Sequence, residues 1–273
     1  MALYLNLYTL TITRVGGNLK VLLSEMTWLE IQERLKRTDI VLVPVGSIEQ
    51  HGLHLPLDTD ILYAFEVAKR AAEAVANDVA CVVAPPICFG YSEHHIDFPG
   101  TISLRPETLL SLVFDVCRSL IHHGFKKIVI VNGHGGNIPI LNIVARRVKD
   151  ELKGLVIVFS YWSLATEAVK KIRESEPGGI AHACEFETSL ALTLRPELIN
   201  KDMIRREIPK SRLSYERIDL FTESKISIPW NTREISQTGV IGDPTKATKE
   251  KGEIILNTII QELTKFLREL KSI

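Results

Sequence analysis

The feature of this sequence that most constrains its fold is a repeated alternation of short apolar runs with longer helical patterns. The run Ile40–Val45 is apolar throughout and rich in β-branched residues, which is typical of a strand buried on both faces. Comparable runs follow at 79–84, 127–131 and 155–160. Strands that alternate with helices of about 12 to 18 residues form βαβ units. The pattern therefore predicts a three-layer α/β/α fold with a mostly parallel sheet.

The helical patterns define the rest of the chain's organisation. They lie at 27–37, 61–75, 106–122, 139–152, 185–194 and 244–270. Thr27 is suited to cap the first helix and Asp243 the last, with Pro244 at its first position. The segment Asn200–Gln237 lacks this periodicity, and we interpret it as an irregular excursion that serves as a lid or subunit contact.

One domain boundary follows from these patterns. We predict an N-terminal extension at 1–20 and a single domain at 21–273. Within the extension, the alternation in Tyr4–Thr13 favours an edge strand or a flexible arm.

Composition excludes several classes of partner. Lys and Arg total 33 and Asp and Glu total 33, so the chain has no net positive field to bind nucleic acid. Asn, Thr and Arg interrupt the N-terminal apolar stretch well before the ~20 apolar residues that a membrane span needs. The four cysteines form no CxxC pair, which favours reduced thiols in a cytoplasm. We therefore expect a cytoplasmic protein with neither nucleic acid nor membrane as a partner.

Three loops beyond predicted strands concentrate the residue types that bind metals. They are 46–60, 132–137 and 182–187. Glu49 and His51 in the first loop point the same way in an extended backbone. Imidazole and carboxylate are the ligands of Zn²⁺, Mn²⁺ and Fe²⁺, and open parallel sheets bind ligands beyond the carboxyl ends of their strands. Burying so many ionisable groups without a counter-charge costs several kcal/mol per group, so the clusters together favour a metal site.

Other chemistries fit the sequence less well. The glycines of 132–137 could cradle a phosphate at a helix start, but their spacing matches neither GxxxxGK[ST] nor GxGxxG. No GxSxG elbow of a serine hydrolase occurs. A Cys184 nucleophile activated by His182 is also disfavoured, because residues so close in sequence seldom have the geometry that a nucleophile and its base need. We instead expect Gly135 and Gly136 to allow close backbone approach to a metal-bound substrate.

A fourth segment has the composition of a substrate wall. Residues 90–104 combine aromatic, imidazole and turn residues after the apolar run at 79–84. Within this segment we expect Tyr91 and His95 to contact the substrate; a structural loop held by Pro99 and Gly100 is the alternative.

Five motifs, in order, resemble the creatininase (creatinine amidohydrolase) family from about Leu23 to Gly252. They are PVGSIEQHG at 44–52, LPLDTD at 55–60, FPGT at 98–101, NGHGGN at 132–137, and His182 followed by ETS at 187–189. The resemblance implies a three-layer α/β/α fold and two divalent ions per chain, either zinc, manganese or iron. It also implies hydrolysis of a non-peptide or cyclic C–N amide bond by a metal-bridging hydroxide, in a homo-oligomer that is commonly a hexamer.

The resemblance also assigns site residues. Carried over position by position, it gives Glu49 and His134 to one metal and His51 to the other. Asp60 bridges the two metals, and His182 transfers a proton to the leaving nitrogen.

One departure from creatininase proper affects the second metal. That enzyme supplies a glutamate two residues after the NGH histidine, where this chain has Gly136, whose side chain cannot bind a metal. We expect Glu185 to replace it, because one helical turn would present Glu185 beside His182; Glu187 is the alternative donor.

A second departure affects the substrate. Gly178 and Gly179 stand where creatininase proper has a tryptophan that encloses creatinine. The NGHGGN form resembles an archaeal formylaminopyrimidine ribotide deformylase of flavin and deazaflavin biosynthesis, and a peptidase of peptide-cofactor maturation. The hypotheses are thus an amidohydrolase of unidentified small-molecule amide substrate, a formamide deformylase, and a non-catalytic metal-binding assembly protein whose second site is empty.

Overall fold

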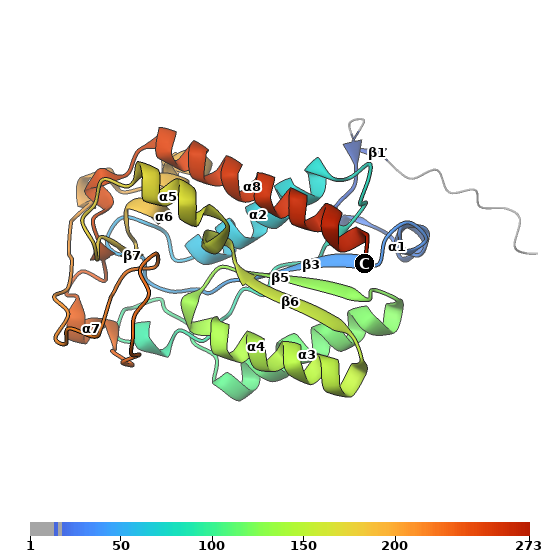
Figure 1. Cartoon of the computed structure of the whole chain (residues 1–273), viewed down its shortest axis with the longest axis horizontal. Coiled ribbons are helices and arrows are strands. Elements are labelled where there is room, and N and C mark those ends of the chain that lie inside the picture. Colours follow the sequence, from blue (N-terminus) through green and yellow to red (C-terminus); the bar gives the residue numbers. More distant parts are fainter. Residues whose placement is uncertain (1–13, 16–17) are drawn as a thin grey trace, which may run out of the picture.

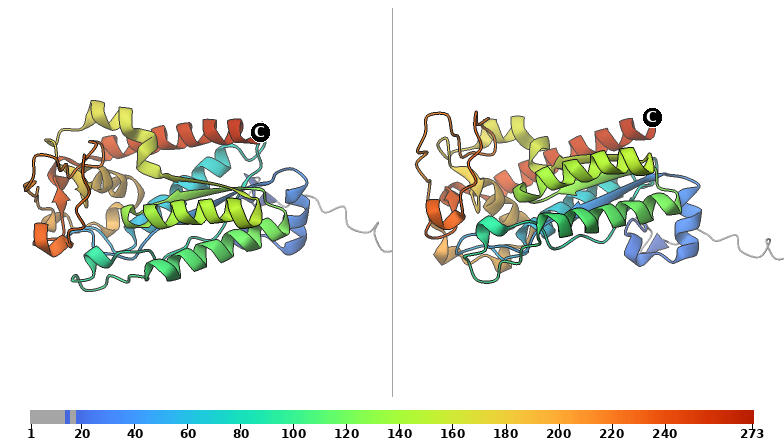
Figure 2. Two further views of the ribbon diagram at one scale, coloured as in Figure 1. Left: turned by 60° about the horizontal axis from the view of Figure 1, so that its bottom comes forward. Right: turned by 90° about the horizontal axis from the view of Figure 1, so that it is seen from below.

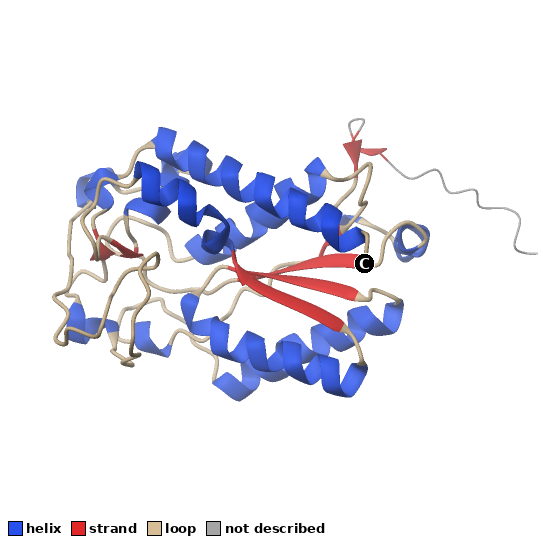
Figure 3. Ribbon diagram, in the orientation of Figure 1, coloured by secondary structure: helices blue, strands red, loops and turns tan. Residues whose placement is uncertain are grey.

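A four-stranded parallel sheet forms the centre of the molecule, in the order β4-β3-β5-β6. The computed structural model describes residues 14–15 and 18–273, so the prediction for Tyr4–Thr13 lies outside the described residues. The strands are β3 (Ile40–Val45), β4 (Val82–Val83), β5 (Lys127–Asn132) and β6 (Leu155–Ser160). Figure 3 shows these strands between two layers of helices, which confirms the predicted three-layer α/β/α fold.

Each face of the sheet carries its own hydrophobic core. Helices α2 (Thr59–Ala74) and α8 (Lys249–Lys271) cover one face, and α3 (Pro106–His123) and α4 (Ile138–Arg147) cover the other (Figures 1 and 2). Successive side chains of β3 alternate between these cores: Leu42 packs with the α2 side and Val43 with the α3 side. The unbroken apolar run at 40–45 therefore reflects burial on both faces.

The remaining elements are short. They are β1 (Arg14–Val15), β2 (Asn18–Leu19), α1 (Trp28–Leu35), α5 (Thr166–Ile172), β7 (Ile180–His182), α6 (Glu185–Leu194), α7 (Thr232–Ile235) and β8 (Ile241–Gly242). Strands β7 and β8 pair antiparallel in a separate small sheet. No helix within residues 18–273 is both long and apolar enough to cross a membrane.

Several predicted boundaries are confirmed and others are wrong. Thr27 caps α1 as expected, accepting a hydrogen bond from the Glu30 amide. The strand predicted at 79–84 shrinks to β4, because Ala80 has a φ of 58°, outside extended geometry. Asp243 caps only a short 3₁₀ turn, since Ala247 returns to extended geometry, and Thr248 caps α8 instead.

The strand order opens a crevice at the carboxyl edge of the sheet. Strands β3 and β5 are neighbours, yet β3 leads into α2 on one face and β5 leads into α4 on the other. The loops after these two strands therefore diverge, which is the usual position of a ligand site in an open parallel sheet. The excursion 200–237 is largely irregular, as predicted, and its helix α7 lies at the same end of the molecule as β7 (Figure 1).

Candidate metal centre

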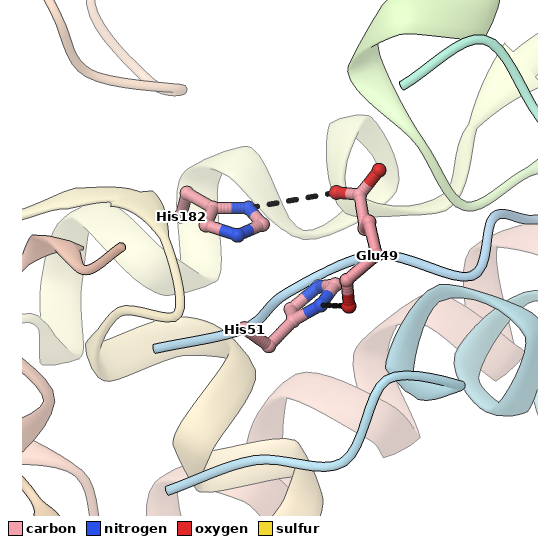
Figure 4. A group of neighbouring side chains, drawn as sticks. All are labelled: Glu49, His51 and His182. Atoms are coloured by element: carbon pink, nitrogen blue, oxygen red, sulfur yellow. Dashed lines mark hydrogen bonds and ion pairs between the residues drawn. The ribbon is translucent and has the colours of Figure 1, made fainter. Parts of the chain in front are cut away.

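Three carboxylates and three imidazoles from separate segments meet in this crevice. The segments are the loop after β3 with the first turn of α2, the loop after β5, the end of β7 and the first turn of α6. The residues are Glu49, His51, Asp60, His134, His182 and Glu187. Their ligand atoms form three overlapping groups, each within 4.8 Å: Glu49–Asp60–His134, His51–Asp60–Glu187 and Glu49–His51–His182. Figure 4 shows the third group.

Asp60 links the first two groups through different oxygens. His134 Nδ1 lies 3.0 Å from Glu49 Oε2 and 3.3 Å from Asp60 Oδ2. His51 Nε2 lies 3.1 Å from Asp60 Oδ1 and 3.8 Å from Glu187 Oε1. Bonds of about 2.1 Å in a tetrahedral arrangement hold neighbouring donors about 3.4 Å apart, so the observed spacings suit a metal ion in each group.

Backbone carbonyls determine which nitrogen of each imidazole faces the carboxylates. His51 Nδ1 donates to the Glu49 carbonyl at 3.2 Å, and His134 Nε2 donates to the Tyr91 carbonyl at 3.0 Å. His182 Nε2 donates to the Gln50 carbonyl at 2.7 Å. Because a carbonyl oxygen only accepts, the proton of each neutral ring is used there, and the other nitrogen presents a lone pair to the cluster. Carboxylate oxygens that face these nitrogens favour a positive charge there, either a second proton on the ring or a metal ion.

The electrostatics of the site also call for a cation. Burial opposes a charge on His51, yet Asp60 and then Glu187 raise its pKa to about 10. Burial raises the pKa of Glu187 to about 7, against the attraction of His51. Asp60 Oδ2 and Glu49 Oε1 are buried without a hydrogen-bond partner within the described part of the chain. The donor set therefore fits divalent metal ions, which supply the positive charge that these groups lack.

The expectation that Glu185 completes the second group is wrong. Its carboxylate accepts hydrogen bonds from the backbone amides of Glu174 and Ser175 and forms an ion pair with Lys251 Nζ at 2.5 Å. Helix α6 begins only at Glu185, and Ala183 has a φ of 49°, so His182 lies on no shared helical turn with it. Two helical residues on, Glu187 points to the opposite side, toward His51.

His182 lies where a proton-transfer residue would act. Its Nδ1 is 3.8 Å from Glu49 Oε1 (Figure 4), and the side chain is only partly exposed. Burial, and then the neighbouring His51, lower the pKa of His182 to about 3. The ring is therefore neutral at rest and presents an unprotonated Nδ1 to the crevice.

The four expected substrate-contact residues lie in different surroundings. His95 is buried, with Nε2 3.4 Å from Glu49 Oε1. Tyr91 lines a cavity beside His134. Gly135 borders open space, whereas a Cβ on Gly136 would overlap the Tyr91 carbonyl and the His134 ring. The backbone of Gly136 therefore lies close to Tyr91 and His134 of the protein itself, and this crowding leaves no room for a larger residue at that position.

A cavity of about 770 Å³ lies next to the candidate ligand groups, because Tyr91 and His94, which line it, both contact His134. The segment after β4 and the excursion 200–237 form its walls. The ring of His94, in the first wall, stacks on His134 with centroids 5.3 Å apart. Trp230, in the second wall, donates its Nε1–H to Glu216 at 2.6 Å. The volume lies within the usual range for small-molecule sites.

Three contacts to the cluster escape prediction from the sequence. Ser92 Oγ donates to Glu49 Oε2 at 2.5 Å, and Gln50 and Thr232 both contact His95 Nδ1. Ser92 follows Tyr91 directly, so its segment was identified although its role was not. Thr232 lies 137 positions from His95 in an aperiodic segment, where no local pattern marks it.

Together, the fold and the ligand groups define an α/β/α protein with a candidate binuclear metal centre at the switch point of its sheet. A family model described as creatininase, creatinine amidohydrolase, matches residues 24–267. The chain belongs to the creatininase family, as its motifs indicated. It is 32% identical over 268 residues to a creatinine amidohydrolase of Pseudomonas putida, covering 91% of this chain and 96% of that relative.

Solved structures and further relatives agree with this assignment. A structure named "Creatininase Mn" superposes with a TM-score of 0.78 at 30% identity, covering 92% of this chain and 98% of that one. A mycofactocin precursor peptide peptidase of Mycobacterium ulcerans is 34% identical, covering 81% of this chain and 82% of the relative. A formylaminopyrimidine ribotide deformylase of Methanobrevibacter smithii is 26% identical, covering 84% and 91%. These relatives are named for different substrates, so family membership by itself leaves the substrate open.

Proposed function

We propose that this chain is a binuclear metal-dependent amidohydrolase. The observation that carries the proposal is the placement of Asp60, whose two carboxylate oxygens face two different imidazole nitrogens, those of His51 and His134 that no backbone carbonyl contacts. A carboxylate bridging two cations needs this arrangement, whereas a capping or core aspartate does not. The relatives named as amidohydrolase, peptidase and deformylase support cleavage of a C–N bond.

The proposed ligand sets follow the contacts. Glu49 and His134 would hold one ion and His51 and Glu187 the other, with Asp60 shared between them. Two divalent ions, zinc, manganese or iron, would supply an activated water and polarise the amide carbonyl. Because Glu187 can take the place left by Gly136, the non-catalytic hypothesis loses its main support.

His182 is the proposed proton carrier. Its Nε2 is held by the Gln50 carbonyl, which leaves Nδ1 directed at the crevice. Nδ1 accepts a proton released during attack on the carbonyl and returns it to the leaving nitrogen. The lowered pKa of His182 makes the protonated ring a strong donor, so it holds the proton only briefly.

The cavity indicates the kind of amide. The walls beside His94 and Trp230 enclose far more volume than one amide group fills. We therefore expect a small-molecule amide whose non-reacting part occupies this cavity, contacting Tyr91. A formamide of a larger molecule, as in the deformylase relatives, fits this description. The chain is further expected to act as a cytoplasmic homo-oligomer, commonly a hexamer, which light scattering would measure.

Asp60→Asn tests the proposal. A neutral amide cannot bridge two cations as a carboxylate does, so we expect bound metal to fall at both sites and hydrolysis of amides to cease. Metal content by mass spectrometry and a screen of formamides, cyclic amides and small peptides provide the measurements. His182→Ala is the matched comparison: metal content should stay near two ions per chain while the rate falls ~10²–10⁴-fold. Two retained ions and normal turnover in Asp60→Asn would overturn the proposal.

A further inference from the structure

His95 is a buried imidazole at the cluster whose contacts differ from those of His51, His134 and His182. Its side chain is 2% exposed, and its ring stacks on His182 with centroids 4.4 Å apart. Nε2 faces Glu49 Oε1 at 3.4 Å. Its Nδ1 faces protein donors rather than a backbone carbonyl: Gln50 Nε2 at 2.9 Å and Thr232 Oγ1 at 2.7 Å.

Two backbone groups fix the orientation of the Gln50 amide. Gln50 Oε1 accepts from the Gly52 amide at 2.8 Å, and Gln50 Nε2 donates to the Gly239 carbonyl at 3.1 Å. A backbone N–H only donates and a backbone carbonyl only accepts, so reversing the side-chain amide would break both bonds. Gly239 has a φ of 85°, and a Cβ at that position would overlap the Gln50 amide. The local backbone is therefore built around this one orientation.

The orientation of Gln50 determines the tautomer of His95. Gln50 Nε2 is a donor, so His95 Nδ1 must accept, and the proton of the neutral ring lies on Nε2. His95 thus points an N–H at Glu49, whereas the three ligand-type imidazoles point lone pairs at the cluster. The oxygen that it faces, Glu49 Oε1, has no hydrogen-bond partner among the described residues, and His95 Nε2 lies nearer to it than His182 Nδ1 does, at 3.4 Å against 3.8 Å.

We propose that His95 is a positioning residue for the metal centre: Gln50 and Thr232 hold it as the Nε2–H tautomer, and this N–H orients the Glu49 carboxylate for metal binding. Thr232 belongs to helix α7 of the excursion 200–237, so seating of that segment supports the orientation of His95. The inference rests on the proposed function only in that Glu49 binds a metal.

The tautomer is measured directly by NMR of the metal-free protein labelled with ¹⁵N-histidine. The signal of His95 is the one that His95→Asn removes. We expect a protonated Nε2 and an unprotonated Nδ1 at neutral pH. A proton on Nδ1, or on both nitrogens, would overturn the proposal whether or not the protein is an amidohydrolase.

Metal affinity distinguishes positioning from packing. In His95→Gln the side-chain amide nitrogen reaches the place of Nε2, whereas in His95→Asn it does not. We expect His95→Asn to weaken binding of Zn²⁺ or Mn²⁺ about 10–100-fold, as loss of a supporting hydrogen bond does at other metal sites, and His95→Gln to restore much of it. Equal losses in the two variants, or no loss in either, would refute a positioning role.

A matched pair of variants tests the contribution of the excursion 200–237 to metal binding. Thr232→Val removes the hydroxyl at nearly constant volume, and we expect several-fold weaker metal binding. Thr222→Val makes the same change at an exposed position of the same segment and should leave affinity unchanged. Unaltered affinity in Thr232→Val would remove Thr232 from the proposal. Chelator competition measures all these affinities without substrate, so a failure to find any amide substrate would leave this test intact.

Discussion

At the scale of single residues, the site depends on which atom of each side chain faces the crevice. Three imidazoles each donate one ring N–H to a backbone carbonyl, of Glu49, Tyr91 or Gln50. In the neutral ring, the other nitrogen then presents its lone pair to the carboxylates. Two of these carbonyls belong to the loop that carries Glu49 and His51, and the third to the segment after β4, so the folded backbone orients the site before any metal binds.

The assignment of Glu187 in place of Glu185 as a proposed metal ligand yields a direct prediction. Glu187→Gln should lose about one ion per chain, since its carboxylate is the one beside His51. Glu185→Gln should keep both ions but lower the free energy of unfolding by about 1–3 kcal/mol, because it weakens the buried pair with Lys251, which retains Glu174 as a partner. Metal analysis and urea denaturation measure the two effects. Loss of an ion in Glu185→Gln alone would reverse the assignment.

His54 predicts a pH dependence of stability. Its Nε2 pairs with Thr188 Oγ1 at 2.8 Å, and burial, then the charge of His51, lower its pKa to about 4. In the unfolded chain this histidine binds a proton near pH 6.5, whereas in the folded chain it does so only near pH 4. The free energy of unfolding should therefore be unaffected by His54 above pH 6.5 and fall by up to about 3 kcal/mol as the pH drops to 4.

His54→Gln should flatten that decline, since glutamine keeps a polar group near Thr188 and binds no proton. Urea denaturation of the metal-free protein between pH 4 and 7 measures the difference from the parent. His123→Gln, at an exposed position, serves as the control. Parallel curves for His54→Gln and the parent would contradict this interpretation.

At the scale of elements, the base of the excursion 200–237 is tied by one carboxylate. Glu207 accepts hydrogen bonds from the Ser236 hydroxyl, from the Gln237 amide and from both the amide and hydroxyl of Thr238. The ends of the intervening segment are thereby held together. That segment carries Thr232 to His95 and Trp230 to the cavity wall.

Glu207→Gln should therefore loosen the excursion without altering the metal ligands. We expect a higher KM, faster proteolytic cleavage within 208–235, and two ions per chain still bound when metal is saturating, because an amide accepts fewer of these bonds than a carboxylate while the proposed ligands are unchanged. Limited proteolysis and steady-state kinetics provide the readouts. Glu223→Gln alters an exposed carboxylate of the same segment and should change neither. Unchanged cleavage in Glu207→Gln would show that other contacts hold the segment.

At the scale of the whole molecule, the two hydrophobic cores lie on the faces of the sheet, whereas the metal cluster lies at its edge. We therefore expect folding to proceed without metal, and metal binding to stabilise the folded state. Each ion present at 100 times its Kd adds about 2.7 kcal/mol, equivalent to about 5–10 °C in Tm.

Chelation should accordingly lower Tm by that order and leave the far-ultraviolet circular dichroism unchanged. Differential scanning calorimetry before and after metal removal measures the shift. Asp60→Asn, which lacks the bridge, should respond little to chelator. A complete loss of helical signal on chelation would contradict the separation of core and site.

The sequence by itself determined the architecture and named most of the candidate ligands that the structure brings together. Short runs such as Ile40–Val45 are apolar at every position, because a strand that is buried on both faces has no side chain in contact with water. The local pattern was therefore enough to predict the sheet. Glu49, His51, Asp60 and His134 follow strands or start a helix, and the carboxyl edge of a parallel sheet gathers such residues. Their proximity therefore followed from the strand pattern.

Only the tertiary structure decided between Glu185 and Glu187 and assigned the partners of His95. Successive side chains of a helix point about 100° apart, so the residue at which α6 begins decides which carboxylate faces His51. Helix α6 begins at Glu185 and not earlier, and Glu187 therefore faces His51 in place of Glu185. The Tyr91 and Gln50 carbonyls and the hydroxyl of Thr232 reach their imidazoles from distant segments, and no local pattern encodes a contact made by packing.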